Sequence, residues 1–276
     1  MDKIVVNSPA KINLGLNLFG KRNDGFHNLE TIFYPLKLAD KIHISKTDDF
    51  IFTTNNSSLS SGTSNLVIKV KDLLENFTKE KINCNIYLEK NIPIGAGLGG
   101  GSSNAAVTLK ALNKLFNLNL SNKTLLELAL TLGSDIPFFL NPVPSFATSR
   151  GEILKEISLK LKGYLLLVYP GVHISTKWAF ENCIPKNNKI QVQRIIKKMS
   201  LDDDFSDLLT NDFEEIVFAE YPQIKEIKER LIEMGAYFTL MTGTGSSVYG
   251  IFHNKDKVEI AKEKFPKESF TYIEEL

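Results

Sequence analysis

Hydrophobic and polar residues alternate along the first half of the chain. Ile12, Leu14, Leu16 and Leu18 are separated by polar residues or glycine, and residues 82–88 repeat the pattern. This period of two predicts half-buried β-strands. Shorter strand-like pieces lie at residues 31–33, 41–44 and 50–52.

Apolar positions spaced three or four apart predict helices. Ser64 or Asn65 can cap a helix that runs to about Phe77, and Ser121 can cap another. The second half begins with a continuous apolar run at 163–169, typical of a buried strand. After it we predict helices at 207–219, 222–234 and 255–265, and strands at 237–241, 248–253 and 270–273.

This order resembles a split β-α-β-β-α-β arrangement with inserted helices. The length of 276 residues suits two medium-sized domains. We predict a first domain at residues 1–158 and a second at 159–276.

Composition narrows the class of protein. Hydrophobic residues make up 43% and charged residues 24%, which is ordinary for a globular protein. The net charge of +1 provides no overall field for nucleic acid or for an anionic membrane, so we expect neither partner. Two cysteines without a disulfide or metal spacing, no signal peptide and no bilayer-spanning apolar run predict a cytoplasmic location.

The most informative segment is rich in glycine and lies between a predicted strand and a predicted helix. It reads Pro-Ile-Gly-Ala-Gly-Leu-Gly-Gly-Gly-Ser-Ser over residues 93–103. Glycine lets the backbone approach a ligand closely, and a helix start presents free N–H groups and a positive dipole end. The segment therefore predicts a phosphate site.

Two common phosphate-binding motifs do not account for this segment. A P-loop needs lysine where Gly101 stands. Gly95, Gly97 and Gly100 match the dinucleotide pattern literally, but that fold needs a strand and an acidic residue after the helix. Here a second helix follows, opened by Ser121.

Three further segments each allow a structural and a chemical interpretation. Residues 242–247, Thr-Gly-Thr-Gly-Ser-Ser, form either a hairpin turn or a second wall of the phosphate site. Asp135, between Gly133 and two phenylalanines, is either a turn residue or a desolvated carboxylate that needs a cation such as Lys11. Phe26 and His27 are either packed in a turn or positioned to stack on a base and hydrogen-bond its edge.

These motifs together resemble the GHMP kinases, a family that includes galactokinase, homoserine kinase, mevalonate kinase and phosphomevalonate kinase. The resemblance rests on residues 9–14, 93–106 and 242–247, in the right order along nearly the whole chain. Residues 22–27, 132–139, 150–152 and 170–176 are most similar to the GHMP kinases that act on 4-diphosphocytidyl-2-C-methyl-D-erythritol.

The resemblance implies an α+β fold of two domains, the first like domain 2 of ribosomal protein S5 and the second ferredoxin-like. It implies ATP-dependent phosphorylation of the 2-hydroxyl of that cytidylyl-linked methylerythritol, in the non-mevalonate route to isopentenyl diphosphate. It also implies Mg²⁺ as the accompanying cation. Homoserine or mevalonate kinase activity, or a catalytically silent nucleotide-binding protein, are the alternatives, and a monomer or homodimer is expected.

The resemblance also assigns residues to roles. The catalytic pair falls on Lys11 and Asp135. Substrate contacts fall on Asn13, Phe26, His27, Thr176 and Phe180, with phenylalanine at 26 where many relatives carry tyrosine. The ATP site falls on Asn65, Leu66, Pro93, Ile94, Gly95, Ala96, Gly97, Leu98, Gly99, Gly100, Gly101, Ser102 and Ser103. A second phosphate wall falls on Gly243, Thr244, Gly245 and Ser246, and no side-chain metal ligand set is expected.

Overall fold

The computed structural model describes residues 2–59, 62, 64–200 and 206–276. The chain forms two compact units whose segments interleave along the sequence. Unit one comprises the residues up to Ala10, Leu36–Ile94 and Gly99–Pro142, and unit two comprises Lys11–Pro35, Gly95–Leu98 and Val143–Leu276. The domain boundary at 158/159 stays a prediction.

Two long strands, β1 (Lys3–Lys21) and β2 (His27–Lys46), supply residues to both units. The prediction of separate short strands at 31–33 and 41–44 is wrong, because both belong to β2. Pro35 interrupts the pattern where β2 changes partner. Its first part pairs with β5 (Ser145–Thr148), and its last part pairs with β4 (Cys84–Glu89). Proline has no N–H for a strand ladder, which explains why this stretch reads as a break.

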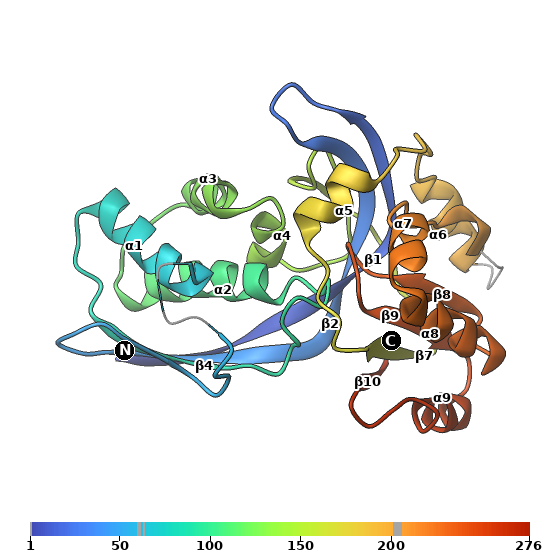
Figure 1. Ribbon diagram of the computed structural model, residues 1–276. Coiled ribbons are helices and arrows are strands. Elements are labelled where there is room, and N and C mark those ends of the chain that lie inside the picture. Colours follow the sequence, from blue (N-terminus) through green and yellow to red (C-terminus); the bar gives the residue numbers. More distant parts are fainter. Residues whose placement is uncertain (1, 60–61, 63, 201–205) are drawn as a thin grey trace. The chain divides into compact units, whose positions relative to one another are not determined.

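Unit one packs helices against one face of a sheet (Figure 1). In that sheet β4 runs antiparallel to β2 and parallel to β3 (Ile51–Thr54). The predicted caps are confirmed at Asn65, which accepts from the Val67 N–H, and at Ser121, which accepts from the Thr124 N–H. The helices are α1 (Leu66–Thr78), α2 (Gly100–Leu115), α3 (Asn122–Leu132) and α4 (Ile136–Leu140).

Unit two contains an antiparallel sheet in the order β10-β7-β9-β8. Apolar residues on one face of β7 and β9 pack with those of two helices, α8 and α9, in a single core. The opposite face is also buried, and there Tyr249 donates its hydroxyl to the Asn13 carbonyl in β1. The predicted β-α-β-β-α-β order is therefore confirmed. Its elements are β7 (Tyr164–Tyr169), α8 (Pro222–Glu233), β8 (Phe238–Met241), β9 (Val248–Phe252), α9 (Lys255–Lys262) and β10 (Phe270–Glu275).

The continuous helix predicted at 207–219 is wrong. A short 3-10 turn is followed by an extended stretch, and a helix begins only at Glu214. The Asp212 N–H donates to Leu16 O at 2.8 Å, and its carboxylate accepts the Leu18 N–H at 2.7 Å. This stretch therefore hydrogen-bonds to β1 instead of forming a helix. The remaining elements of unit two are β6 (Ile153–Glu156), α5 (Thr176–Asn182), α6 (Val192–Ser200), η1 (Ser206–Leu208) and α7 (Glu214–Glu220).

No helix in the described part of the chain combines the length and the apolar character that crossing a bilayer requires.

Candidate active site

The glycine-rich segment leads from β4 into the first turn of α2. Gly99 is the N-cap of that helix, and among the described residues no side chain caps it. The first N–H groups of α2 can therefore bind an anion in place of a cap. Buried Ala105 and Ala106 keep this end of the helix close to its neighbours in unit one.

The two serines that follow the glycines differ in exposure. Ser103 is fully buried, and its hydroxyl accepts a hydrogen bond from Ser8 at 2.8 Å. Ser102 is partly exposed. A ligand at the helix start therefore has readier access to the Ser102 hydroxyl.

The two residues predicted to hold adenosine lie where α1 begins. Leu66 approaches the glycine segment, since a Cβ on Gly101 would lie 3.8 Å from Leu66 Cδ1. Asn65 is 8% exposed and caps α1 through its Oδ1. Leu66 is thus the member of this pair that packs beside the glycine-rich segment.

Lys11 is buried, with 3% of its surface exposed. Its Nζ donates to Asn13 Oδ1 at 2.6 Å and to the Gly97 carbonyl at 3.1 Å. It also lies 5.5 Å from the centre of the Phe33 ring. The expectation of a half-buried strand is wrong here, because the polar face of β1 at Lys11 and Asn13 is covered as fully as its apolar face.

Asn13 connects the first motif to the third. Its amide nitrogen donates to Thr31 Oγ1 at 2.8 Å, and its Oδ1 accepts the Gly243 N–H at 2.9 Å. Thr242 Oγ1 accepts the Asn13 N–H at 3.0 Å. Asn13, which was predicted to contact the substrate, is only 2% exposed. Its hydrogen bonds link β1 to residues 242–243.

The second glycine-serine stretch is both a connection between β8 and β9 and a wall against Gly97. The Thr242 N–H donates to Ser247 O at 3.0 Å, closing the turn. Gly243 packs on Gly97, whose backbone would lie 3.1 Å from an added Cβ. Ser246 is fully buried and donates to the Val172 carbonyl. Thr244 is partly exposed, with its Oγ1 3.5 Å from Thr176 Oγ1.

Asp135 is partly buried at the N-cap of α4, directly before Ile136 and Pro137. It belongs to unit one, and Lys11 belongs to unit two. The convergence of these two side chains stays a prediction.

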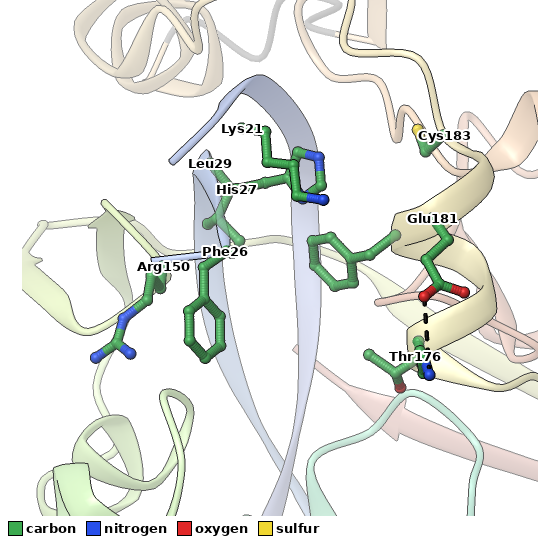
Figure 2. Close-up of a pocket in the computed structure, with 11 residues that line it drawn as sticks. Lys21, Phe26, His27, Leu29, Arg150, Thr176, Glu181 and Cys183 are labelled. Carbon is green, nitrogen blue, oxygen red and sulfur yellow. Dashed lines mark ion pairs between the residues drawn. The ribbon is translucent and has the colours of Figure 1, made fainter. Parts of the chain in front are cut away.

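A pocket of about 490 Å³ in unit two brings together four of the predicted substrate residues (Figure 2). The imidazole of His27 stacks on the Phe180 ring with 5.6 Å between centroids. Phe26 is 50% exposed, and the Arg150 guanidinium lies 4.7 Å from its centroid. The pocket is lined by Lys21, Gly25, Phe26, His27, Leu29, Arg150, Thr176, Lys177, Phe180, Glu181 and Cys183.

Burial and neighbouring charges affect the histidine of this pocket, and Arg22 makes hydrogen bonds from the turn before it. Burial, together with the nearby charge of Lys21, lowers the pKa of His27, so the imidazole is uncharged at pH 7. The Arg22 guanidinium hydrogen-bonds to Asp24 and to Ser149 Oγ, the latter at 2.7 Å. These bonds join the turn before Phe26 to the turn that carries Arg150.

Sequence patterns alone did not point to several groups at this site. Lys21 and Cys183 line the pocket without belonging to any motif, and burial raises the pKa of the Cys183 thiol to about 11. His173 lies within one of the motifs but carried no assigned role. Its Nδ1 would be 2.3 Å from a Cβ on Gly95, so the ring lies directly on the glycine segment. Within the described residues, no cluster of three His, Cys, Asp or Glu side chains could hold a metal.

Comparisons with known proteins agree with this geometry. The family model for the GHMP kinases N-terminal domain matches residues 65–141, and that for the GHMP kinases C-terminal domain matches residues 191–270. The chain is 40% identical over 275 residues to a 4-diphosphocytidyl-2-C-methyl-D-erythritol kinase of Chlorobium phaeobacteroides, covering 96% of each chain.

Solved structures give the same answer for the fold. The crystal structure of a 4-(cytidine 5′-diphospho)-2C-methyl-D-erythritol kinase superposes with a TM-score of 0.85 at 30% identity, over 98% of each chain. A homoserine kinase from Cytophaga hutchinsonii superposes with a TM-score of 0.75 at 17% identity, over 99% of this chain and 94% of that one, which shows the fold alone. The predicted two-domain α+β fold is confirmed. The chain belongs to the GHMP kinases, a family of ATP-dependent small-molecule kinases.

Proposed function

We propose that this kinase transfers a phosphoryl group from ATP to the 2-hydroxyl of 4-diphosphocytidyl-2-C-methyl-D-erythritol. The observation that carries this proposal is the aromatic pocket of unit two. The 40% identical relative is named for this acceptor, and this pocket has the features that a cytidylyl group would need. The reaction would then be a step of the non-mevalonate route to isopentenyl diphosphate.

The pocket suits a flat base followed by a diphosphate. Aromatic faces bind bases by stacking, and both Phe26 and Phe180 line this pocket. The neutral His27 can both donate and accept a hydrogen bond at a base edge. Lys21 and Arg150 supply positive charge for a diphosphate.

The proposed catalytic groups are Lys11 and Asp135. Phosphoryl transfer depends mainly on positioning and on neutralising charge. The Lys11 ammonium is held in place by Asn13 and by the Gly97 carbonyl, so it can stabilise the transferring group without reorganising. In this proposal Asp135 orients the acceptor hydroxyl and receives its proton.

The proposed cation is Mg²⁺, carried mainly by the nucleotide. Mg²⁺ usually keeps several waters and binds through substrate phosphates with few protein ligands. The partly exposed Ser102 hydroxyl fits that role, and the described residues offer no cluster of three His, Cys, Asp or Glu side chains that would hold the ion independently. The ion would neutralise phosphate charge when bound.

The direct test is transfer of labelled phosphate from ATP to a panel of acceptors. We expect transfer to the cytidylyl-linked methylerythritol and not to homoserine, mevalonate or the methylerythritol unit without its cytidine. Transfer to homoserine or mevalonate would replace this proposal by one of those activities. Failure with every acceptor, together with intact ATP binding, would favour the catalytically silent alternative.

Two substitutions test the catalytic pair. Asp135→Asn should lower kcat by about 10²–10⁴-fold, the usual contribution of a general base. Lys11→Met should lower kcat by about 10²–10³-fold, as loss of an electrostatic stabiliser does. Both variants should still bind the cytidylyl substrate. Near-native kcat in either variant would remove that residue from the mechanism.

The expectations about assembly and partners remain proposals. A monomer or homodimer is distinguished by sedimentation of the purified chain. Absence of binding to nucleic acid and to anionic vesicles is checked in the same buffer, because the net charge of +1 gives no overall attraction to either.

A further inference from the structure

Asp40 is a fully buried carboxylate in β2 with four hydrogen bonds. Its Oδ1 accepts the N–H groups of Asn91 and Ile92 at 2.7 and 2.8 Å. Its Oδ2 accepts from Lys90 Nζ and from Asn104 Nδ2, the latter at 2.9 Å. An ionised carboxylate is stable at such depth only when its oxygens are paired in this way.

The partners of Asp40 flank the glycine-rich segment in the sequence. Residues 90–92 come directly before Pro93, and Asn104 comes directly after Ser103. One side chain therefore holds both ends of the segment 93–103. A second bond strengthens the far end, because Ser8 Oγ accepts from Asn104 Nδ2 at 2.9 Å and donates to Ser103 Oγ.

The same cluster reaches the first turn of α2. A Cβ on Gly100 would lie 3.3 Å from Lys90 Nζ and 3.1 Å from Ile92 Cγ2. The Lys90 side chain is 4% exposed and is paired with the fully buried Asp40. The cluster is thus a nearly neutral, water-excluded support beneath the helix start.

We propose that Asp40 is a positioning residue for the phosphate donor: it holds the two ends of the segment 93–103 at a fixed separation, so that the N–H groups at the start of α2 meet the nucleotide. This inference rests on the proposed function of that segment as the ATP site. No motif of the sequence pointed to Asp40, because it stands as a lone acidic residue in an alternating strand.

Charge and positioning predict opposite effects when Asp40 is replaced. Asp40→Asn keeps the shape but removes a negative charge close to the anion site. If charge alone mattered, ATP would bind more tightly, because the Lys90 ammonium would be left uncompensated. If positioning matters, ATP binds less tightly, because the bonds to Lys90 and Asn104 weaken and the segment loses its fixed geometry.

The experiment measures KM and kcat with each substrate in turn, and the Kd of a non-hydrolysable ATP analogue, for wild type and for Asp40→Asn. Positioning predicts a loss of about 10- to 100-fold in kcat/KM for ATP, with weaker analogue binding. KM for the acceptor should stay within about twofold. Lys90→Met removes the positively charged partner of Asp40 in the same cluster. This variant should also bind the ATP analogue more weakly.

The matched control is Glu75→Gln. The Glu75 carboxylate pairs with Lys71 Nζ at 2.7 Å and accepts the Ile82 N–H at 2.8 Å, also within unit one. It therefore loses an ion pair and one backbone bond, at a site that is partly exposed, without touching the segment 93–103. We expect a smaller loss of thermal stability than in Asp40→Asn, because Glu75 is partly exposed, and unchanged kinetics for ATP.

The outcomes separate the two ideas. Unchanged or tighter ATP binding in Asp40→Asn overturns the positioning role, as does an equal loss in Glu75→Gln. If Asp40→Asn does not fold, Lys90→Met and Asn104→Ala decide, and native ATP affinity in both overturns it. A wild-type chain that transfers no phosphate from ATP and does not bind the analogue overturns the proposed function instead.

Discussion

The two glycine-serine stretches look alike in sequence but differ in their structural surroundings. Residues 93–103 lead into a helix whose first turn has no side-chain cap among the described residues, and Gly101 is exposed. Residues 242–247 join two strands, and Gly245, Ser246 and Ser247 are buried. The start of the helix is exposed in the first stretch, whereas most residues of the second stretch are buried.

The glycines differ in what a side chain would meet. A Cβ on Gly97 would lie 2.4 Å from Thr242 O and 2.9 Å from Gly245 O, both of them backbone atoms that cannot move aside cheaply. A Cβ on Gly101 would find only Leu66 Cδ1, at 3.8 Å. Close packing of two backbones requires glycine at position 97. Gly101, in contrast, has open space beside it at the protein surface.

The largest expected effect is from Gly97→Ala. Gly97 has a positive φ of 77°, where an alanine costs about 1–2 kcal/mol. The clash with the second stretch adds the cost of overpacking, about 1–3 kcal/mol. We expect a loss of about 3 kcal/mol in the free energy of unfolding, measured by urea denaturation. Native stability of this variant would contradict the packing role of Gly97.

The next effect concerns the hydroxyl that joins the second stretch to β1. Thr242→Val keeps the shape but leaves the buried Asn13 N–H without its acceptor. An unsatisfied buried donor costs about 1–3 kcal/mol, so we expect that loss in unfolding free energy. Thr242→Ser is the control, because it keeps the oxygen. Equal stability of the two variants would show that the hydrogen bond contributes nothing.

Part of this fold could be predicted from the sequence. Lys11 donates to the Gly97 carbonyl and Gly243 packs on Gly97, so residues of three separate motifs lie together within unit two. The split order of strands and helices was predictable because its six elements show apolar runs or periods in the sequence, as in the continuous apolar run of β7. Apolar patterns within a single element predict that element well, because they depend on neighbouring residues alone.

Other features depend on contacts that no local pattern encodes. Asn13 and Lys11 look like an exposed polar face, but β1 is covered there by Thr242 and Gly97, more than eighty residues away in sequence. Asp40 gains its role only because residues 90–92 and Asn104 fold around it. Burial by distant segments reverses what alternation predicts for such polar residues.

A smaller effect, of a different kind, is expected from Gly101→Ala. Alanine is a better helix former than glycine by up to about 1 kcal/mol, so unfolding free energy should stay level or rise. The added methyl group would lie on the exposed surface of the helix start beside Leu66. We expect KM for ATP to rise about tenfold, since small displacements at a reacting site are costly. An unchanged KM for ATP would place the nucleotide elsewhere.

The smallest effects come from one serine in each stretch, and they should be opposite in character. Ser246→Ala removes a buried donor to the Val172 carbonyl, so it should lower unfolding free energy by about 1 kcal/mol. Its KM for ATP should stay near that of wild type, because Ser246 is fully buried.

Ser102→Ala should leave the free energy of unfolding within about 0.5 kcal/mol of wild type, as substitutions of partly exposed residues usually do. It should also raise KM for ATP by a few-fold and increase the Mg²⁺ concentration needed for half-maximal rate. If both serines instead changed stability alone, residues 93–103 would serve the interior as residues 242–247 do, and the contrast between the two stretches would fail.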